Sequence, residues 1–234
     1  MSETKLLVLG APRSGTSLLA GMIGAHPNVA MLREEYAGSM GKIVGKEVVA
    51  NKLCIPNQIG FSHSWWNRLL RRYGYTFFRG YSVVSIEDYM SDPRMRVVGV
   101  VRSPYAVVDS MIRRGGLRKH AAYARWAKGT EMLTELSQRY QDRVLILSFE
   151  RLVQEPQTVM SSVCDHLSLE YSDAMMLGHR HTASYDSENS TIDPGKAEVS
   201  SGLIEKHPLH VDYRDEFELY RSLKNGDRQR ESKG

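Results

Sequence analysis

The feature that most constrains the fold is a glycine-bounded loop between an apolar run and a helical pattern near the N-terminus. Residues 5–9 read KLLVL, a run typical of a strand buried on both faces. The loop 10–15 reads GAPRSG, and residues 16–25 then carry apolar side chains at helical spacing before Pro27. Loop amides and the first helical turn can together surround an anion, so this G-x4-G spacing predicts a phosphate-binding loop.

The rest of the chain repeats the alternation of strands and helices. Further strand-like runs occupy residues 47–55, 95–101 and 143–149, and helical patterns follow Ser103-Pro104 and occupy residues 117–140 and 156–167. This order predicts an α/β fold, a P-loop-type three-layer sandwich with a central parallel sheet. A chain of 234 residues with 41% hydrophobic residues can form a core without disulfides. We predict one domain over residues 1–220 and a polar, basic, flexible tail over residues 221–234.

Charge and cysteine content narrow the class of protein. The net charge is +4, of which residues 221–234 contribute +3, so the body gives no reason to expect nucleic acid as a partner. Cys54 and Cys164 have no metal-type spacing, and His179 and His181 lack further ligands at the usual intervals, so we predict no metal site. With no transmembrane segment and no signal peptide recognisable, we expect a cytoplasmic protein.

The phosphate loop departs from that of nucleotide kinases at one position. Thr16 stands where those enzymes carry the lysine that reaches the terminal phosphates. The loop places a cation earlier, as Arg13. A small-molecule kinase that uses ATP is therefore the alternative and not the first choice.

The loop sequence PRSGTS resembles the 5′-phosphosulfate loop of sulfotransferases, which use 3′-phosphoadenosine 5′-phosphosulfate (PAPS). The longer run GAPRSGTSLLAGMIGAHPNV is most similar to the tyrosylprotein and glycan-type branch of that family. The resemblance implies that the loop holds the 5′-phosphosulfate. The residues implied are Arg13, Ser14, Gly15, Thr16 and Ser17.

A second run, VVRSPYAVVDSMIRR, resembles the family's element for the 3′-phosphate. It has Arg102 at the end of a strand, Ser110 eight residues later and Arg114 beyond it. An arginine can contact a phosphate through two parallel hydrogen bonds, which a lysine does not reproduce. The resemblance assigns all three residues to the nucleotide.

Catalytic residues are implied by two further segments. Asn51-Lys52 resembles the NKDP-type segment, whose lysine steadies the transferring sulfuryl group. Cys54 falls where cytosolic sulfotransferases have their histidine base, so the resemblance moves the base to the run REEY. We predict Glu35 as the general base, with Glu34 as the second candidate, and Lys52 and Arg13 as stabilisers of charge.

Three other segments leave alternatives open. Phe149, in SFERLV, replaces a tyrosine that lies near the adenine in the family. Ser190-Thr191 and Lys196 correspond either to the family's closing loop or to a polar surface loop. The aromatic residues within 65–81 are either core or an acceptor pocket.

The predicted activity is transfer of a sulfuryl group from PAPS to an acceptor hydroxyl or amine, with 3′,5′-ADP (PAP) as product and no metal required. The acceptor is a glycan, a small molecule, a lipid or a peptide. Besides the ATP-dependent kinase, an inactive nucleotide-binding module is the other alternative.

Overall fold

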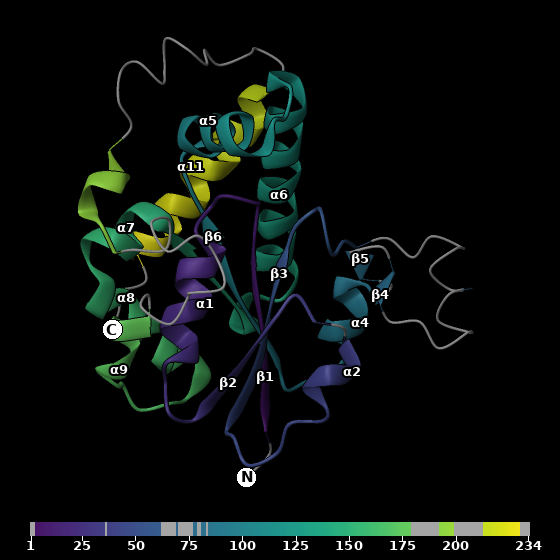
Figure 1. Cartoon of the computed structure of the whole chain (residues 1–234), viewed down its shortest axis with the longest axis vertical. Coiled ribbons are helices and arrows are strands. Elements are labelled where there is room, and N and C mark those ends of the chain that lie inside the picture. Colours follow the sequence, from purple (N-terminus) through teal and green to yellow (C-terminus); the bar gives the residue numbers. More distant parts are fainter. Residues whose placement is uncertain are drawn as a thin grey trace.

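The structure is a computed structural model, and it describes residues 3–35, 37–61, 69, 77–78, 81–82, 84–178, 192–198 and 213–229. At its centre lies a five-stranded sheet with the order β2-β3-β1-β6-β7, in which every neighbouring pair is parallel (Figure 1). Its strands are β1 (Thr4–Gly10), β2 (Val29–Arg33), β3 (Val48–Cys54), β6 (Met95–Val101) and β7 (Val144–Ser148). A separate antiparallel pair joins β4 (Phe77–Phe78) to β5 (Tyr81–Ser82). The predicted α/β fold with a central parallel sheet is confirmed.

The position of β1 determines where a ligand can bind. Gly10, its last residue, is in register with Cys54 of β3 and Val100 of β6. β3 lies on one side of β1 in the sheet and β6 lies on the other, so the strand order reverses its direction at β1. Ligands of open α/β sheets bind outside the carboxyl ends of the strands at such a switch point. The loop after Gly10 lies at this edge.

Helices cover both faces of the sheet, because side chains of buried strands alternate between the faces. Leu6 and Val8 face one layer, and Leu7 and Leu9 face the other. The first layer contains α1 (Thr16–Gly24), α7 (Phe149–Gln154), α8 (Pro156–Leu167) and α9 (Ala174–Leu177). The second contains α2 (Ala37–Met40), α4 (Ile86–Met90), α5 (Pro104–Gly115), α6 (Lys119–Arg139) and α11 (Arg214–Gln229).

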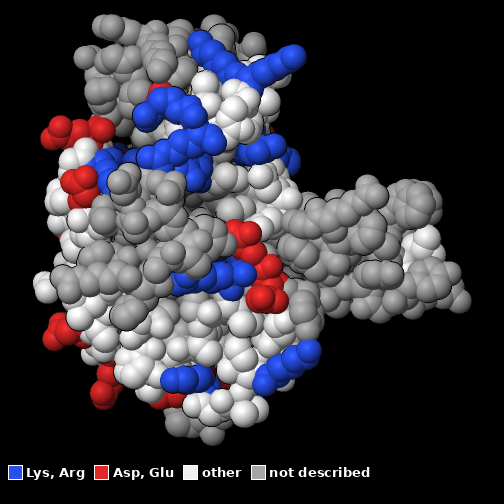
Figure 2. Space-filling view, viewed as in Figure 1, with Lys and Arg blue, Asp and Glu red and all other residues white. Residues whose placement is uncertain are grey.

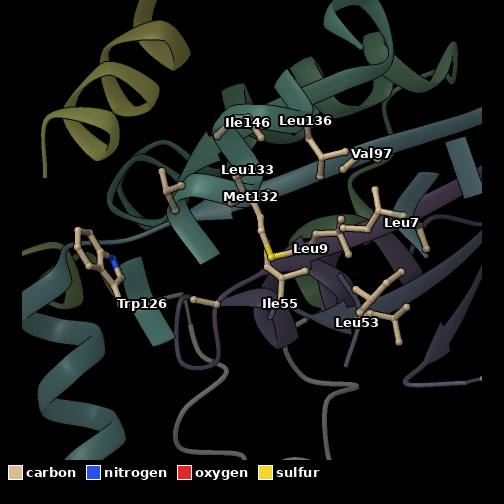
Figure 3. Packing of buried hydrophobic residues seen from close by; sticks show 14 of the residues in the cluster. Leu7, Leu9, Leu53, Ile55, Val97, Trp126, Met132, Leu133, Leu136 and Ile146 are labelled. Atoms are coloured by element: carbon tan, nitrogen blue, oxygen red, sulfur yellow. The ribbon is translucent and has the colours of Figure 1, made fainter. Parts of the chain in front are cut away.

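The second layer has the larger core (Figure 3). Leu133 and Leu136 of α6 pack above Val97 and Leu9, and Leu53 and Ile55 continue the cluster toward the end of β3. Two short 3₁₀ turns complete the described elements. They are η1 (Gln141–Arg143) and η4 (Pro194–Ala197).

The strands and helices that carry long apolar patterns were predicted correctly to within about two residues at each end. The predicted flexible tail is wrong for residues 221–229, which belong to α11. Phe217 and Tyr220 of this helix pack against Trp126, and Asp227 is buried in an ion pair with Arg151. Arg221, Ser222 and Asn225, which are among the polar residues that suggested a tail, are exposed on the helix. Residues 230–234 lie outside the described residues.

None of the helices in the described ranges is long and apolar enough to cross a membrane. Of the segment with Ser190-Thr191 and Lys196, the structure describes residues 192–198, which include η4.

Candidate functional site

The loop over residues 10–15 joins β1 to α1 in a conformation that requires both of its glycines. A Cβ atom on Gly10 would lie 2.8 Å from the carbonyl oxygen of Val100. Gly15 has φ of 103°, and a Cβ atom there would lie 2.3 Å from the ring of Phe149. The two glycines allow the loop to lie close to β6 and α7, as a phosphate loop needs.

Inside the loop, the polar groups of Ser14 form hydrogen bonds within the loop itself. Its backbone N–H and its hydroxyl both donate to the carbonyl oxygen of Ala11, at 3.1 and 2.6 Å. The amides of Gly15, Thr16 and Ser17 stand at the start of α1, where N–H groups have no partner within the helix. Such amides are the groups through which a loop of this kind can bind an anion.

The two nucleotide-binding elements expected from the sequence meet at Arg13. Its Nε donates to the hydroxyl of Ser110 on α5 at 3.0 Å. The guanidinium of Arg102 donates to the backbone oxygens of Arg13 and Lys196, at 3.3 and 3.4 Å. Four parts of the chain therefore meet around Arg13 and Arg102. They are the loop, the end of β6, α5 and η4.

This place has a concentration of positive charge. Burial lowers the pKa of Arg102, Glu150 opposes the shift, and Arg13 and Arg114 add to it. Burial also lowers the pKa of Lys196, and Arg102 and Arg114 contribute. Adjacent cations repel one another in a partly buried site, so the arrangement is favourable when an anion lies among them.

Two buried atoms at this place make no hydrogen bond, the Nε of Arg102 and the Oε2 of Glu150. The Nε of Arg102 is buried and makes no hydrogen bond, although a buried guanidinium N–H is costly to leave unpaired. The exposed Arg114 lies in the last turn of α5 beside Arg113. Figure 2 shows Lys and Arg side chains gathered at the top of the molecule, in the region of α5 and α11. The charge and the unpaired donor both suit a phosphate group.

Arg102 packs against the first residue of α7, Phe149. Its guanidinium lies 4.0 Å from the centre of the Phe149 ring, so the ring packs against Arg102 and against Gly15. The buried Glu150 accepts a hydrogen bond from the backbone N–H of Ser103 at 2.8 Å, next to Arg102. Burial and then the Glu150 carboxylate raise the pKa of Tyr220 on α11. Glu150 therefore links α11 to the end of β6.

A second cluster lies at the carboxyl ends of β2 and β3. Lys52 is buried, with 3% of its surface exposed, and its Nζ forms an ion pair with Oε1 of Glu34. The backbone N–H of Glu34 donates to the carbonyl of Lys52 at 2.9 Å. The other carboxylate oxygen of Glu34 accepts a hydrogen bond from Nε2 of Gln58 at 2.7 Å.

The two candidate bases are placed differently. Glu35 is exposed, and its backbone N–H and carbonyl bond to the side chain of Asn51 at 3.3 and 2.7 Å. Glu34 has φ of 60°, which turns the chain so that its carboxylate reaches Lys52. The contact with the predicted catalytic lysine is thus made by Glu34, the second candidate, whereas Glu35 was our first choice.

Cys54 lies between the Glu34–Lys52 pair and the start of α1. Burial raises the pKa of its thiol, the Lys52 ammonium lowers it, and the Glu34 carboxylate raises it further. The Thr16 hydroxyl is hydrogen-bonded to the same thiol. The carboxylate and the lysine therefore lie near the first residue of α1.

Several sequence candidates fall outside the described residues. These are His179, His181, Ser190 and Thr191, and of the aromatic segment 65–81 only residues 69, 77–78 and 81 are described. Within the described ranges, no group of three or more His, Cys, Asp or Glu side chains could hold a metal ion. No sequence signal singles out Gln58, which lies in a turn and belongs to none of the motifs of the family.

Comparison with known proteins finds one family that is similar to part of the chain. Residues 91–173 match the family model described as "Sulfotransferase family". The chain resembles the sulfotransferases. The matched stretch carries Arg102, Ser110, Arg114 and Glu150, whereas the loop and the Glu34–Lys52 pair precede it.

Solved sulfotransferase structures share the fold over nearly the whole chain. The sulfotransferase domain of the Synechococcus PCC 7002 olefin synthase is 18% identical, with a TM-score of 0.56 and 94% of each chain covered. The sulfotransferase domain from the curacin biosynthetic pathway is also 18% identical, with a TM-score of 0.57 over 94% of this chain and 97% of that one. Mouse sulfotransferase SULT7A1, complexed with PAP, is 14% identical, with a TM-score of 0.56 over 95% and 85%. No curated protein matches the sequence.

Proposed function

We propose that this chain transfers a sulfuryl group from PAPS to the hydroxyl or amine of an acceptor and releases PAP. The observation that carries the proposal is the meeting of Arg13, Ser110 and Arg102 beside the loop, with the Nε of Arg102 buried and unpaired. One doubly phosphorylated nucleotide would contact both the loop and this cluster. The crystal structure of mouse SULT7A1 with PAP, which has the same fold, supports this choice of nucleotide.

In the proposed complex, the amides of Gly15, Thr16 and Ser17 hold the 5′-phosphosulfate at the start of α1. Arg102, Ser110 and Arg114 hold the 3′-phosphate. Arg13 already contacts Ser110 and lies between the two anionic ends, so it serves both of them.

The Glu34–Lys52 pair supplies the chemistry in this proposal. PAPS provides the activated sulfuryl group, and the Glu34 carboxylate accepts the proton that the acceptor oxygen or nitrogen loses. Protonation of Glu34 removes the charge that holds Lys52, so the ammonium can then stabilise the sulfuryl and leaving-group oxygens. No step in this scheme calls for a metal ion.

The experiment is a thermal unfolding series with PAP, ATP or no ligand. We expect PAP to raise the melting temperature, because a ligand at a hundredfold excess over its Kd stabilises by about 2.7 kcal/mol. ATP, which lacks a 3′-phosphate, should have a much smaller effect. Stabilisation by ATP alone would favour the kinase alternative. Stabilisation by PAP without transfer from PAPS to any of a broad panel of acceptors would favour the inactive module.

The Arg102→Ala variant tests the cluster directly. We expect it to weaken PAP binding by about tenfold to a hundredfold, since a charged hydrogen-bonding partner of the phosphate is lost. The matched control is Arg96→Ala near the start of β6, the strand that Arg102 follows, and its guanidinium donates to the carbonyl of Pro93 at the opposite end of the sheet. An unchanged Kd for PAP in Arg102→Ala, measured by calorimetry, would remove this arginine from the site.

A further inference from the structure

Gln58 connects the end of β3 to the carboxylate of Glu34. Its backbone N–H donates to the carbonyl of Cys54 at 2.7 Å, which closes a tight turn after the strand. Its side-chain Oε1 accepts a hydrogen bond from the backbone N–H of Cys54 at 2.6 Å. Its Nε2 donates to Oε2 of Glu34 at 2.7 Å.

The chemistry of these partners fixes the orientation of the amide. A backbone N–H can only donate, so the oxygen of the Gln58 amide must face Cys54. The NH₂ group must then face Glu34, whose ionised carboxylate can only accept hydrogen bonds. Both oxygens of Glu34 are therefore engaged, Oε1 by Lys52 and Oε2 by Gln58.

The same turn is attached to the phosphate loop. The backbone N–H of Ile55 donates to the carbonyl of Gly10 at 3.0 Å, and Gly10 is the first residue of that loop. Gln58 is only partly exposed, as is Glu34. The position of the carboxylate is thus tied, through Gln58 and this short turn, to the place where the loop begins.

We propose that Gln58 is a positioning residue for Glu34, an inference that rests on the proposed function for its catalytic meaning. Lys52 has to serve two partners during transfer, the carboxylate and the sulfuryl oxygens. Gln58 keeps the carboxylate in place while Lys52 changes partner, and its N–H favours the ionised form that accepts the proton. Among the described residues, titratable groups that face Glu34 include Lys52 and Cys54 on β3, and Arg33 and Glu35 flank it in the chain.

The test is the Gln58→Met variant, which keeps the length of the side chain and removes both its N–H donor to Glu34 and the oxygen that accepts from Cys54. The Glu34 carboxyl is followed by NMR with carbon-13-labelled glutamate, and Glu34→Gln assigns its signal. We expect the pKa of Glu34 to rise by about one in Gln58→Met, because a hydrogen bond to the charged form is lost. Turnover at neutral pH should fall about tenfold, with little change in the KM for PAPS.

Asn57→Ala is the matched control, since Asn57 lies in the same turn with an exposed side chain. It should leave the Glu34 pKa and the turnover unchanged. An unaltered Glu34 pKa in Gln58→Met would overturn the proposal, and so would a loss of stabilisation by PAP, which would mark the residue as a structural part of the loop. If Gln58→Met shifts the pKa while Glu34→Gln keeps full turnover, the positioning contact stands and the assignment of Glu34 as base is wrong.

Discussion

At the residue scale, backbone conformation distinguishes the candidate site from its surroundings. In the described part of the chain, Arg13, Glu34 and Ser168 are the non-glycine residues with positive φ. Ser168 ends α8, where a left-handed residue is common. Arg13 and Glu34 end no helix, and each pays a conformational cost of about 1 kcal/mol or more to direct a side chain into the site.

The choice between the two neighbouring glutamates is the sharpest prediction at this scale. We expect Glu34→Gln to lower turnover by about 10²–10⁴-fold, because an amide cannot accept the acceptor's proton. Glu35→Gln should leave turnover within about twofold, since its side chain is exposed. The measurement is transfer of labelled sulfate from PAPS to the acceptor that a panel of hydroxyl compounds and amines identifies. The reverse ranking of the two variants would restore Glu35 as the base.

The sequence was sufficient to place a carboxylate near Lys52 but not to choose which one. Two adjacent glutamates after HPNV were both available, and the choice depends on the positive φ of Glu34, which no side-chain pattern predicts. Gln58 was missed for a similar reason. Its role comes from a turn that returns the chain toward β2, and a single glutamine in a turn carries no signal in the sequence.

At the scale of elements, the long apolar runs made the sheet predictable and the polar segments did not. β1, β3, β6 and β7 are continuous buried runs, and each was predicted. β2 is an edge strand in which only Val29 is buried, so its sequence lacks that signature. α11 was missed because its polar residues dominate the composition, although its apolar side chains pack in the second layer.

A buried ion pair adds to the aromatic contacts that attach α11. Asp227 accepts from Nη1 of Arg151 at 2.9 Å and from the backbone N–H of Ser148 at 2.9 Å. We expect Asp227→Ala to lower the free energy of unfolding by about 3–5 kcal/mol, because it removes one partner from a buried pair. Urea denaturation followed by circular dichroism measures this change.

The control for that variant is an exposed ion pair on the same helix. Glu218→Ala removes the partner of Arg221, and both side chains are largely exposed. Such pairs contribute about 0–1 kcal/mol, so this variant should be close to the parent. Equal, small effects of Asp227→Ala and Glu218→Ala would show that α11 is held by its aromatic contacts alone.

At the scale of the whole molecule, the site depends on segments that are far apart in the sequence. The loop follows β1, Arg102 follows β6, and Lys196 belongs to η4, yet the three meet through the hydrogen bonds of one guanidinium. The sequence predicted the first two as separate anion-binding elements, because each has a recognisable motif. Their contact through Arg13 and Ser110 follows from the adjacency of β1 and β6 in the sheet.

The gathered charge leads to a prediction about ionic strength. PAP carries one more phosphate than 5′-AMP, and in the proposed complex the arginine cluster binds that additional group. We expect PAP affinity to fall clearly between about 50 and 500 mM salt, since the Debye length shrinks to a few ångströms over this range. The affinity for 5′-AMP, which contacts mainly the loop amides, should be weaker and less dependent on salt.

In the Arg102→Ala variant, the affinities for PAP and for 5′-AMP should become similar. Without this guanidinium, the 3′-phosphate loses its main partner, so the affinity for PAP and its salt dependence should both approach those of 5′-AMP. Calorimetric titrations of the parent and the variant at three salt concentrations measure both quantities. If the variant retains the full salt dependence of the parent, the 3′-phosphate is bound by other cations, and the cluster at Arg102 serves a different anion.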